Sequence, residues 1–495
     1  MKDDNVTEVE KNNVKIFILN MNGKKYVICS ALGHLYTVGD PTKNRRIYPV
    51  FDIEWFPADA FNKKIQSSKR IKIIHELSGG ADLFINACDF DLEGETIGYN
   101  ILKYACGEKQ ETSLRAKFST LTEDELKESF KQVERRVADG LAKAGRARHV
   151  LDFIFGVNLS RALTESYLRN MGFYKVISIG RVQGPTLKYV VERETEINTF
   201  VPTPYWRVNA KFDLNGRILV ADYENKQISQ YSHLLTLKNS CKGQQAVVRR
   251  VNKSIFEYSP PPAFNLGDLQ KESFKVFRCS PSQTLRIAEG LYLKALISYP
   301  RTSSQKLPPS INYKKIFKGL QCNHSYYDAV TEILKGSIIP KQGDQDDPAH
   351  PEIYPTGKTQ QYPLSYKSGD IYNLIVKRFL ATFCDPAIIQ RLTATIDING
   401  YSFIVTSKLV ISEGWLKHNI KYSTISNDQI PNLTEGQILR LIGISSREMF
   451  HKPSPRYSQG TLLEKMEKEE IGTKSTRGEV IETLFKRGIL PALET

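Results

Sequence analysis

The strongest constraint in this sequence is a short apolar run that ends in closely spaced acidic residues. Residues 83–88 (LFINAC) have the length and composition of a buried strand, and Asp89, Asp91 and Glu93 follow at once. Behind them a helical pattern places four apolar side chains on one face, those of Ile97, Ile101, Leu102 and Ala105. Strand, acidic loop and helix predict an α/β unit with its site at the carboxyl end of the strand.

The acidic loop has the composition of a metal site. Residues two apart project to the same side of an extended segment, so the three carboxylates are expected to converge. Converging carboxylates need a cation, and a hard oxygen site that keeps its waters suits Mg²⁺. Such ions bind phosphate oxygens and stabilise charge in phosphoryl transfer. A solvated acidic loop is the alternative, but the position directly after a buried strand favours the metal site.

Hydrophobic patterning divides the rest of the chain. Residues 122–199 are helical and basic, whereas residues 204–258 and 392–442 alternate apolar and polar side chains, so one β domain is expected to be entered twice. Residues 264–299 are expected to be helical, with Ser282 as an N-cap and Pro300 ending the helix. The tail from residue 456 is helical too, and Thr476 and Glu479 have the spacing of a capping box.

Composition narrows the function. A chain of 495 residues is long enough for several folding units. Its 69 Lys and Arg against 54 acidic residues give a net charge of +15, which indicates a polyanionic partner, most often nucleic acid, although a generally basic protein is the alternative. The seven cysteines form no CxxC pair, which argues against a zinc ribbon and fits a reducing cytosol. The sequence contains no G-x-x-x-x-G-K-[ST] motif for ATP and no apolar run of 18 residues.

A tyrosine precedes a proline and an arginine in the segment ISYPRT. Pro300 biases Tyr299 away from helical geometry, so the phenol is expected at a turn, and Arg301 could reach the same phosphate. A phenol with a pKa of about 10 is a poor nucleophile at neutral pH, and nearby cations would lower that barrier. Because the chain has 24 tyrosines, a purely structural Tyr299 is the alternative.

Two further segments offer donors. In SIGRVQGPT, glycines 180 and 184 allow close backbone approach to a ligand, and Arg181 and Gln183 supply hydrogen-bond donors; the segment is equally compatible with a turn between helices. In AHPEIYPTG, the loop residue His350 could shuttle a proton or hold a phosphate, with a structural histidine as the alternative.

Taken together, these segments resemble the type IA DNA topoisomerase family. The acidic residues match its TOPRIM triplet, ISIGRVQGPTL resembles S-x-G-R-V-Q-x-P-T-L, and LYLKALISYPRTSSQKLP resembles the segment that carries the family's nucleophilic tyrosine, here Tyr299. DPAHPEIYPTG resembles its histidine loop, and EEIGTKSTRGEVIETLFKRGIL resembles its G-x-G-[TR]-x-[SA]-T segment. The phrases NACDFDLEGETIGYNIL, GVNLSRALT and SSQKLPPS are most similar to archaeal members.

The resemblance implies a multidomain α/β, α and β fold in the shape of a torus. Its parts would be a TOPRIM α/β domain, helical DNA-gripping and Tyr domains, and a β arch. The expected ranges are residues 1–112 for the TOPRIM domain, 113–200 and 449–495 for the DNA-gripping domain, 201–260 and 391–448 for the arch, and 261–390 for the Tyr domain.

The resemblance also implies a reaction. The enzyme would cleave, pass and rejoin single DNA strands without ATP, through a 5′-phosphotyrosyl bond, and relax negative supercoils. Single-stranded or underwound DNA would be the partner, Mg²⁺ the cofactor, and the cytoplasm, in association with the nucleoid, the location. The implied residues are Tyr299, Arg301 and His350 for catalysis, Arg148, Arg181, Gln183, Lys474 and Thr476 for DNA binding, and Asp89, Asp91 and Glu93 for the metal.

The sequence departs from the family pattern at its two ends. Members begin with a strand that carries E-[KS]-P, whose Glu lies near the scissile phosphate, and they continue beyond the position of KRGIL. Neither Glu-Lys-Pro nor Glu-Ser-Pro occurs here. We therefore expect a separate N-terminal fragment or a longer chain, and weak relaxation by residues 1–495 alone. A non-catalytic single-stranded-DNA-binding fragment and the topoisomerase half of a split reverse gyrase, with a helicase partner, are the alternatives.

Overall fold

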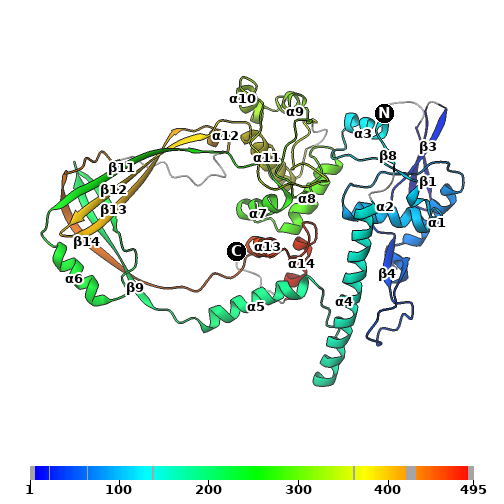
Figure 1. The fold of residues 1–495 in the computed structure, drawn as a ribbon, viewed down its shortest axis with the longest axis horizontal. Coiled ribbons are helices and arrows are strands. Elements are labelled where there is room, and N and C mark those ends of the chain that lie inside the picture. Colours follow the sequence, from blue (N-terminus) through cyan, green and yellow to red (C-terminus); the bar gives the residue numbers. More distant parts are fainter. Residues whose placement is uncertain are drawn as a thin grey trace.

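The chain forms four structural units, seen in a computed structural model that describes residues 6–21, 23–63, 65–135, 139–359, 363–419 and 431–488. The N-terminal unit and a β-barrel lie at opposite ends of the long axis of the molecule, and helices fill the middle (Figure 1). None of the described helices is both long and apolar enough to cross a membrane.

The N-terminal unit contains three small sheets and the helices that pack on them. The first sheet is antiparallel, in the order β1 (Val6–Lys11), β2 (Val14–Met21) and β3 (Lys24–Cys29). A second pairs β4 (Tyr36–Gly39) with β5 (Glu54–Pro57), and a third contains β6 (Ile85–Asn86), β7 (Leu114–Arg115) and β8 (Glu134–Arg135). The helices are η1 (Ala58–Ala60), α1 (Ser67–Ser78), α2 (Leu92–Tyr104), η2 (Lys109–Glu111) and α3 (Glu123–Lys131). Parallel β6 and β7 flank α2 in the chain, which confirms the order strand, loop, helix. The predicted buried strand over residues 83–88 is wrong in extent, because β6 has two residues and Leu83 is 57% exposed.

A closed six-stranded barrel forms from two distant stretches of sequence. Its strands are β9 (Pro204–Leu214), β10 (Arg217–Tyr223), β11 (Ala246–Tyr258), β12 (Ala387–Ile398), β13 (Tyr401–Ser412) and β14 (Ile438–Phe450), in the order β10-β13-β12-β11-β14-β9. Alternate residues of β12 are buried, as period-2 patterning requires. Helix α6 (Tyr231–Cys241) adds Leu234, Leu237 and Cys241 to the barrel core. The chain therefore enters one β unit twice, as the two alternating stretches predict.

The chain between the two visits to the barrel forms a helical unit around Tyr299. Its helices are α7 (Leu266–Phe277), α8 (Pro281–Leu293), α9 (Tyr313–Leu320), α10 (His324–Ile333) and α11 (Tyr366–Ala381), with α12 (Leu416–Asn419) added from the second visit. The apolar faces of α7 to α11 share one large core, in which Phe317 and Phe379 are fully buried. Leu416 of α12 packs in a smaller cluster with Ala381 of α11. The large core supports the segment that carries Tyr299.

Two predicted details of this helical unit are wrong. The N-cap of α8 is Ser280, not Ser282, because Ser280 Oγ accepts a hydrogen bond of 3.2 Å from the N–H of Gln283 and Pro281 occupies the first turn. The helix also ends at Leu293, well before Pro300, and Ala295 adopts a left-handed backbone conformation with φ of 56°. Tyr299 therefore lies in an irregular segment beyond the helix.

The fourth unit combines helices from the middle and the end of the chain. It contains α4 (Asp139–Met171), α5 (Gln183–Thr199), α13 (Gln459–Lys468) and α14 (Arg477–Lys486). Val190 of α5 packs with Met466 and Ile481 in one small core. The capping box expected at Thr476 is absent, because its Oγ1 accepts a hydrogen bond of 3.0 Å from the N–H of Thr473 and makes no cap bond to α14.

Helix α4 also packs tightly on α2 of the N-terminal unit. Gly145 of α4 is buried at this crossing, where a methyl group would overlap the hydroxyl of Thr96 and approach the carbonyl of Leu92. The close approach of the two helices sets how far side chains of α4 reach over the start of α2.

We predict that Gly145→Ala destabilises this crossing. Overpacking costs roughly 1–3 kcal/mol, so the thermal midpoint and the amide hydrogen-exchange protection of α2 and α4 should fall. Gly140→Ala is the matched control, because Gly140 lies in the same helix with open space around it and alanine is the better helix former. Equal behaviour of the two variants would contradict the prediction.

Candidate active site

The acidic loop joins β6 to α2 and brings two carboxylates to the start of the helix. Asp91 is the N-cap of α2, and its Oδ1 accepts a hydrogen bond of 2.7 Å from the N–H of Gly94. A side chain at Gly94 would overlap the backbone carbonyl of Asp89. The expectation of one extended segment is therefore wrong beyond Asp91, since Glu93 already lies in the first turn of α2.

A fully buried ion pair beneath the loop was not predicted from the sequence. The guanidinium of Arg115 pairs with the carboxylate of Glu95, and neither side chain is exposed. Arg115 also donates hydrogen bonds of 3.0 Å to the carbonyls of Asn86 and Asp89. One cation thus connects β6, β7, α2 and the acidic loop. Strand β7 has only two residues, too few for a recognisable pattern around this arginine.

Tyr299 lies directly against the acidic loop. Its hydroxyl donates a hydrogen bond of 2.6 Å to Asp91 Oδ2, and its backbone N–H donates one of 2.7 Å to the carbonyl of Ser119. The hydroxyl of a second tyrosine, Tyr292, donates a hydrogen bond of 3.1 Å to Asp89 Oδ1. The two phenol rings meet edge to face, with centroids 5.3 Å apart. The helical unit and the N-terminal unit therefore meet at this pair of phenols and carboxylates.

Burial and charge keep Tyr299 protonated. The side chain is 4% exposed, and burial raises its pKa far above the ordinary value. The carboxylates of Asp91 and Asp89 raise it further, and Arg301 opposes them. Burial also raises the pKa of Asp89. Nucleophilic attack by this phenol therefore requires a group that takes its proton, and the group already in hydrogen-bond contact is Asp91.

The two other residues predicted for catalysis lie at the same place. Arg301 donates a hydrogen bond of 2.7 Å from Nε to Glu289, a partner that was not predicted. The ring of His350 lies 4.5 Å from that of Tyr299, centroid to centroid, and its Nδ1 is 2.9 Å from the hydroxyl of Ser119. Burial lowers the pKa of His350 to about 4, so its imidazole is neutral at pH 7.

Lys474 reaches the histidine loop through an acidic partner. Its Nζ pairs with Asp347, which also accepts hydrogen bonds of 3.0 Å from the N–H groups of Ser303 and Ala349. Burial opposes ionisation of Asp347, but Lys474 and these backbone donors outweigh burial and lower its pKa to about 2. The loop before α14 is thereby held beside His350.

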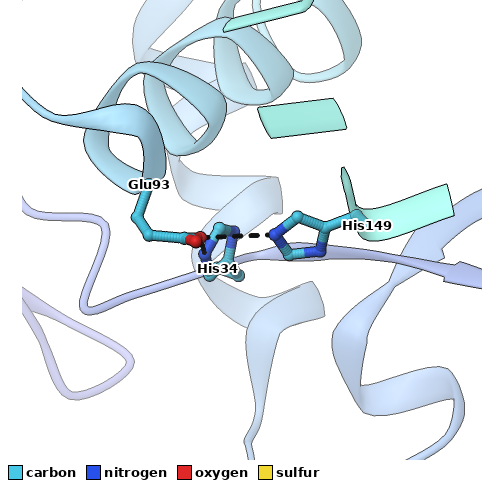
Figure 2. Close-up of side chains that lie close together, drawn as sticks. All are labelled: His34, Glu93 and His149. Carbon is cyan, nitrogen blue, oxygen red and sulfur yellow. Dashed lines mark hydrogen bonds and ion pairs between the residues drawn. The ribbon is translucent and has the colours of Figure 1, made fainter. Parts of the chain in front are cut away.

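Glu93 faces a different set of partners from the two aspartates. Its Oε1 accepts a hydrogen bond of 2.8 Å from Arg148, and its Oε2 lies 2.8 Å from His34 Nε2 and 3.3 Å from His149 Nε2 (Figure 2). Burial opposes ionisation, but these three bonds outweigh it and hold the pKa of Glu93 well below its usual range. The expected convergence of all three acidic residues is therefore wrong, because helical geometry turns Glu93 toward α4.

The remaining residues predicted to bind DNA lie farther along the helical units. Arg181 donates a hydrogen bond of 2.9 Å to Asp152, which also pairs with Arg148 at 3.5 Å. Gln183 is the first residue of α5, and Thr476 precedes α14. The structure thus joins Arg181 to Arg148 through one carboxylate, whereas the hydrogen bonds of Tyr299 in the described part of the chain go to Asp91 and Ser119 and not to Gln183 or Thr476.

We predict that Asp347 stabilises the fold above about pH 4. Its pKa in the folded chain lies below the usual value of about 3.9, so the stabilisation is complete above that value and is lost as the pH falls toward 2. A shift of this size corresponds to roughly 2–3 kcal/mol at neutral pH. Asp347→Asn should lower the thermal midpoint at pH 7 and have little effect near pH 2.

The matched control for this prediction is Asp346→Asn, because Asp346 is the exposed neighbour of Asp347. We expect this variant to follow the unsubstituted chain at every pH. A thermal midpoint for Asp347→Asn that does not depend on pH relative to the unsubstituted chain would show that the ion pair with Lys474 contributes nothing.

Comparisons with known proteins identify the relatives of this chain. The DNA topoisomerase family matches residues 136–492, and the Toprim domain matches residues 9–121. DNA topoisomerase 1 of Pyrococcus horikoshii is 40% identical over 472 residues, which are 94% of this chain and 68% of that protein. DNA topoisomerase 1 of Aeropyrum pernix is 37% identical over 98% of this chain and 72% of that protein.

A solved structure is also similar. Full-length topoisomerase I from Thermotoga maritima superposes with a TM-score of 0.71 at 27% identity, covering 93% of this chain and 74% of that one. Against four archaeal relatives, including that of Methanocaldococcus jannaschii, the chain spans between 62% and 72% of their length. On the family matches, the archaeal identities and the shared fold, the chain belongs to the type IA DNA topoisomerases, enzymes that change DNA topology by cleaving and passing single strands.

Proposed function

We propose that this chain cleaves and rejoins single DNA strands without ATP, with Tyr299 as the nucleophile. The observation that carries the proposal is the hydrogen bond of 2.6 Å from the Tyr299 hydroxyl to Asp91, beside Asp89 and His350. This contact gives the Tyr299 phenol a proton acceptor and a setting of paired carboxylates, and Tyr299 differs from the neighbouring Tyr292 in its ring contact with His350. Relaxation of negatively supercoiled DNA is the expected result.

The bond changes are balanced within the strand. Tyr299 Oη forms a bond to a backbone phosphorus, and the bond from that phosphorus to the 3′-oxygen breaks, which leaves a 5′-phosphotyrosyl group and a 3′-hydroxyl. The phenolic proton passes to Asp91, and the protonated Asp91 returns a proton, directly or through water, to the leaving 3′-oxygen. Because one phosphodiester replaces another, little free energy is lost and the reverse attack by the 3′-hydroxyl rejoins the strand.

Cationic and neutral donors would stabilise the phosphate during this exchange. Arg301 carries a charge close enough to Tyr299 to oppose the rise of its pKa, and His350 is neutral and in ring contact with it. In catalysis of this kind, hydrogen-bond donors aimed at the developing negative charge in a buried setting usually lower the barrier more than any other effect. We assign Arg301 and His350 to the phosphate that Tyr299 attacks.

The closed conformation has a consequence for the order of events. Tyr299 is 4% exposed, and its hydrogen bonds to Asp91 and Ser119 cross from the helical unit to the N-terminal unit. A DNA strand can reach the hydroxyl only after these units move apart at least locally. We therefore propose that binding of the strand, or of the ion, precedes exposure of the nucleophile.

Toprim domains generally bind Mg²⁺, and Asp89 and Asp91 fit such an ion. Their hard carboxylate oxygens lie close enough for the charge of Asp91 to raise the pKa of Asp89, which marks a site where a cation is favourable. Bound there, Mg²⁺ would supply positive charge to phosphate oxygens. We propose Glu93 as a more distant contributor, since its carboxylate is held by other groups.

Members of this family bind single-stranded DNA, and the remaining predicted residues are proposed to hold that strand. Arg148 and Arg181 share the acidic partner Asp152, so their charges lie close together on the helical side of the site. We propose phosphate contacts for these two arginines and for Lys474, and backbone contacts for Gln183 and Thr476. The sequence ranges assigned above to the domains remain part of this proposal.

We predict that Tyr299→Phe abolishes covalent capture of DNA, because only the hydroxyl is lost. A single-stranded oligonucleotide labelled at its 3′ end should transfer label to the unsubstituted chain, since the 5′ phosphate of the downstream piece stays on the protein. Tyr292→Phe is the control, because Tyr292 is also buried and donates to the acidic pair. Adduct retained by Tyr299→Phe and lost by Tyr292→Phe would reassign the nucleophile, and label transferred from the 5′ end would reverse the polarity.

We predict that Asp89→Asn and Asp91→Asn together abolish Mg²⁺-dependent relaxation by a full-length enzyme, whereas single changes are milder because one carboxylate remains. Asparagine keeps the N-cap of α2, so the helix should survive. Asp82→Ala, an exposed acidic residue of the same unit, serves as the control. Supercoil relaxation on agarose gels across a Mg²⁺ titration measures the effect, and full activity in the double variant would exclude the metal role.

A further inference from the structure

Three potential metal ligands from separate segments converge beside the start of α2. His34 lies between β3 and β4, Glu93 in the first turn of α2, and His149 in α4. One ligand atom from each residue lies within 4.8 Å of the other two, and Figure 2 shows both imidazoles directed at the carboxylate. Within the described part of the chain, this is the one group of three or more His, Cys, Asp and Glu residues that meets this spacing.

The two oxygens of the Glu93 carboxylate have different partners. Both Nε2 atoms address the same oxygen, Glu93 Oε2, at 2.8 Å from His34 and 3.3 Å from His149. The other oxygen, Oε1, accepts a hydrogen bond of 2.8 Å from Arg148. A donor on the oxygen that does not bind the metal is the usual way in which a neighbouring side chain orients a metal-binding carboxylate.

The separations match those between neighbouring ligands of a small divalent ion. Bonds of about 2.0–2.1 Å to nitrogen and oxygen place adjacent ligand atoms roughly 3.0–3.4 Å apart, depending on geometry. The two N–O distances lie at or just below that range, so an ion could enter with small side-chain movements. Side-chain exposures of 29%, 19% and 25% for His34, Glu93 and His149 leave a path for entry.

The positive charge of Arg148 is the main obstacle to a cation here, and the structure compensates it. Arg148 also pairs with Asp152 at 3.5 Å, so part of its charge is balanced outside the cluster. The carboxylate and the two imidazoles then remain for the ion, the same donor set as in a His₂Glu zinc site.

We propose that His34, Glu93 and His149 bind a divalent transition-metal ion, with Zn²⁺ as the best match. Two imidazole nitrogens select ions of this class, whereas Asp89 and Asp91 offer only oxygen and suit Mg²⁺. Three protein ligands leave a coordination position for water or a phosphate oxygen. The ion would connect the loop of His34 to α2 and α4. Binding of this ion does not depend on the strand cleavage proposed above.

Titration of the metal-free 495-residue chain with Co²⁺ tests the proposal, because Co²⁺ reports its ligands by visible absorption. One equivalent should bind, Zn²⁺ should displace it, and a hundredfold excess of Mg²⁺ should not. His34→Ala and His149→Ala should each weaken binding by about 100-fold or more, since each removes a ligand. His233→Ala, which changes an exposed histidine of α6, should bind normally. The paired change Asp89→Asn and Asp91→Asn should also leave Co²⁺ binding unaltered, which separates this site from the Mg²⁺ site.

A second measurement guards against misfolded variants. Zn²⁺ should raise the thermal midpoint of the unsubstituted chain and of His233→Ala, but not that of His34→Gln or His149→Gln, whose metal-free midpoints show whether they fold. Three results would overturn the proposal: no Co²⁺ binding, binding that survives loss of either histidine, or an intense near-ultraviolet band that marks thiolate ligands from the cysteines.

Discussion

The contact between Tyr299 and Asp91 holds the active site in its observed arrangement. It joins a helical unit to the N-terminal unit across 208 residues of sequence. A second hydrogen bond, from Tyr292 to Asp89, joins the same two units beside it. Both phenols are buried, so each hydroxyl needs an acceptor, and each carboxylate needs a donor. The two units therefore satisfy each other's polar groups at this contact.

The same bonds keep the Tyr299 hydroxyl buried in the observed conformation. A buried, hydrogen-bonded phenol whose pKa is raised cannot act on a phosphate that cannot approach it. In the proposed reaction, separation of the units would expose the Tyr299 hydroxyl and free the Asp91 carboxylate to hold a cation. Under that proposal, one set of contacts would control both access to the Tyr299 hydroxyl and release of the Asp91 carboxylate. The barrel, which closes through pairings between strands far apart in sequence, connects the remaining parts across the molecule (Figure 1).

Charge is distributed unequally over the three acidic residues of the loop. Asp89 and Asp91 lie in a half-buried, carboxylate-rich setting that favours a cation, whereas Glu93 lies among His34, Arg148 and His149. The division follows from backbone geometry, because Asp91 caps α2 and Glu93 lies in the first turn of that helix. The Arg115–Glu95 pair fixes this geometry from below by binding the carbonyl of Asp89. Three acidic residues that are evenly spaced in the sequence thus lie in two different environments.

The local elements and the chemistry they can carry follow from the sequence alone. A short apolar run predicted a strand before Asp89, and periodicity predicted the helix after it and two stretches of one β unit, because these patterns depend on hydrogen bonds and side-chain spacing within a few residues. The segments around Tyr299, Gly180 and His350 were sufficient to indicate the family. Tertiary packing was needed to show that Glu93 turns away from the aspartates, that Ala295 rather than Pro300 frees Tyr299 from the helix, and that Arg115 and Glu289 hold the site. These features depend on packing between units far apart in the chain or on the backbone conformation of a single residue. Neither produces a periodic pattern in the sequence, so neither could be predicted from it.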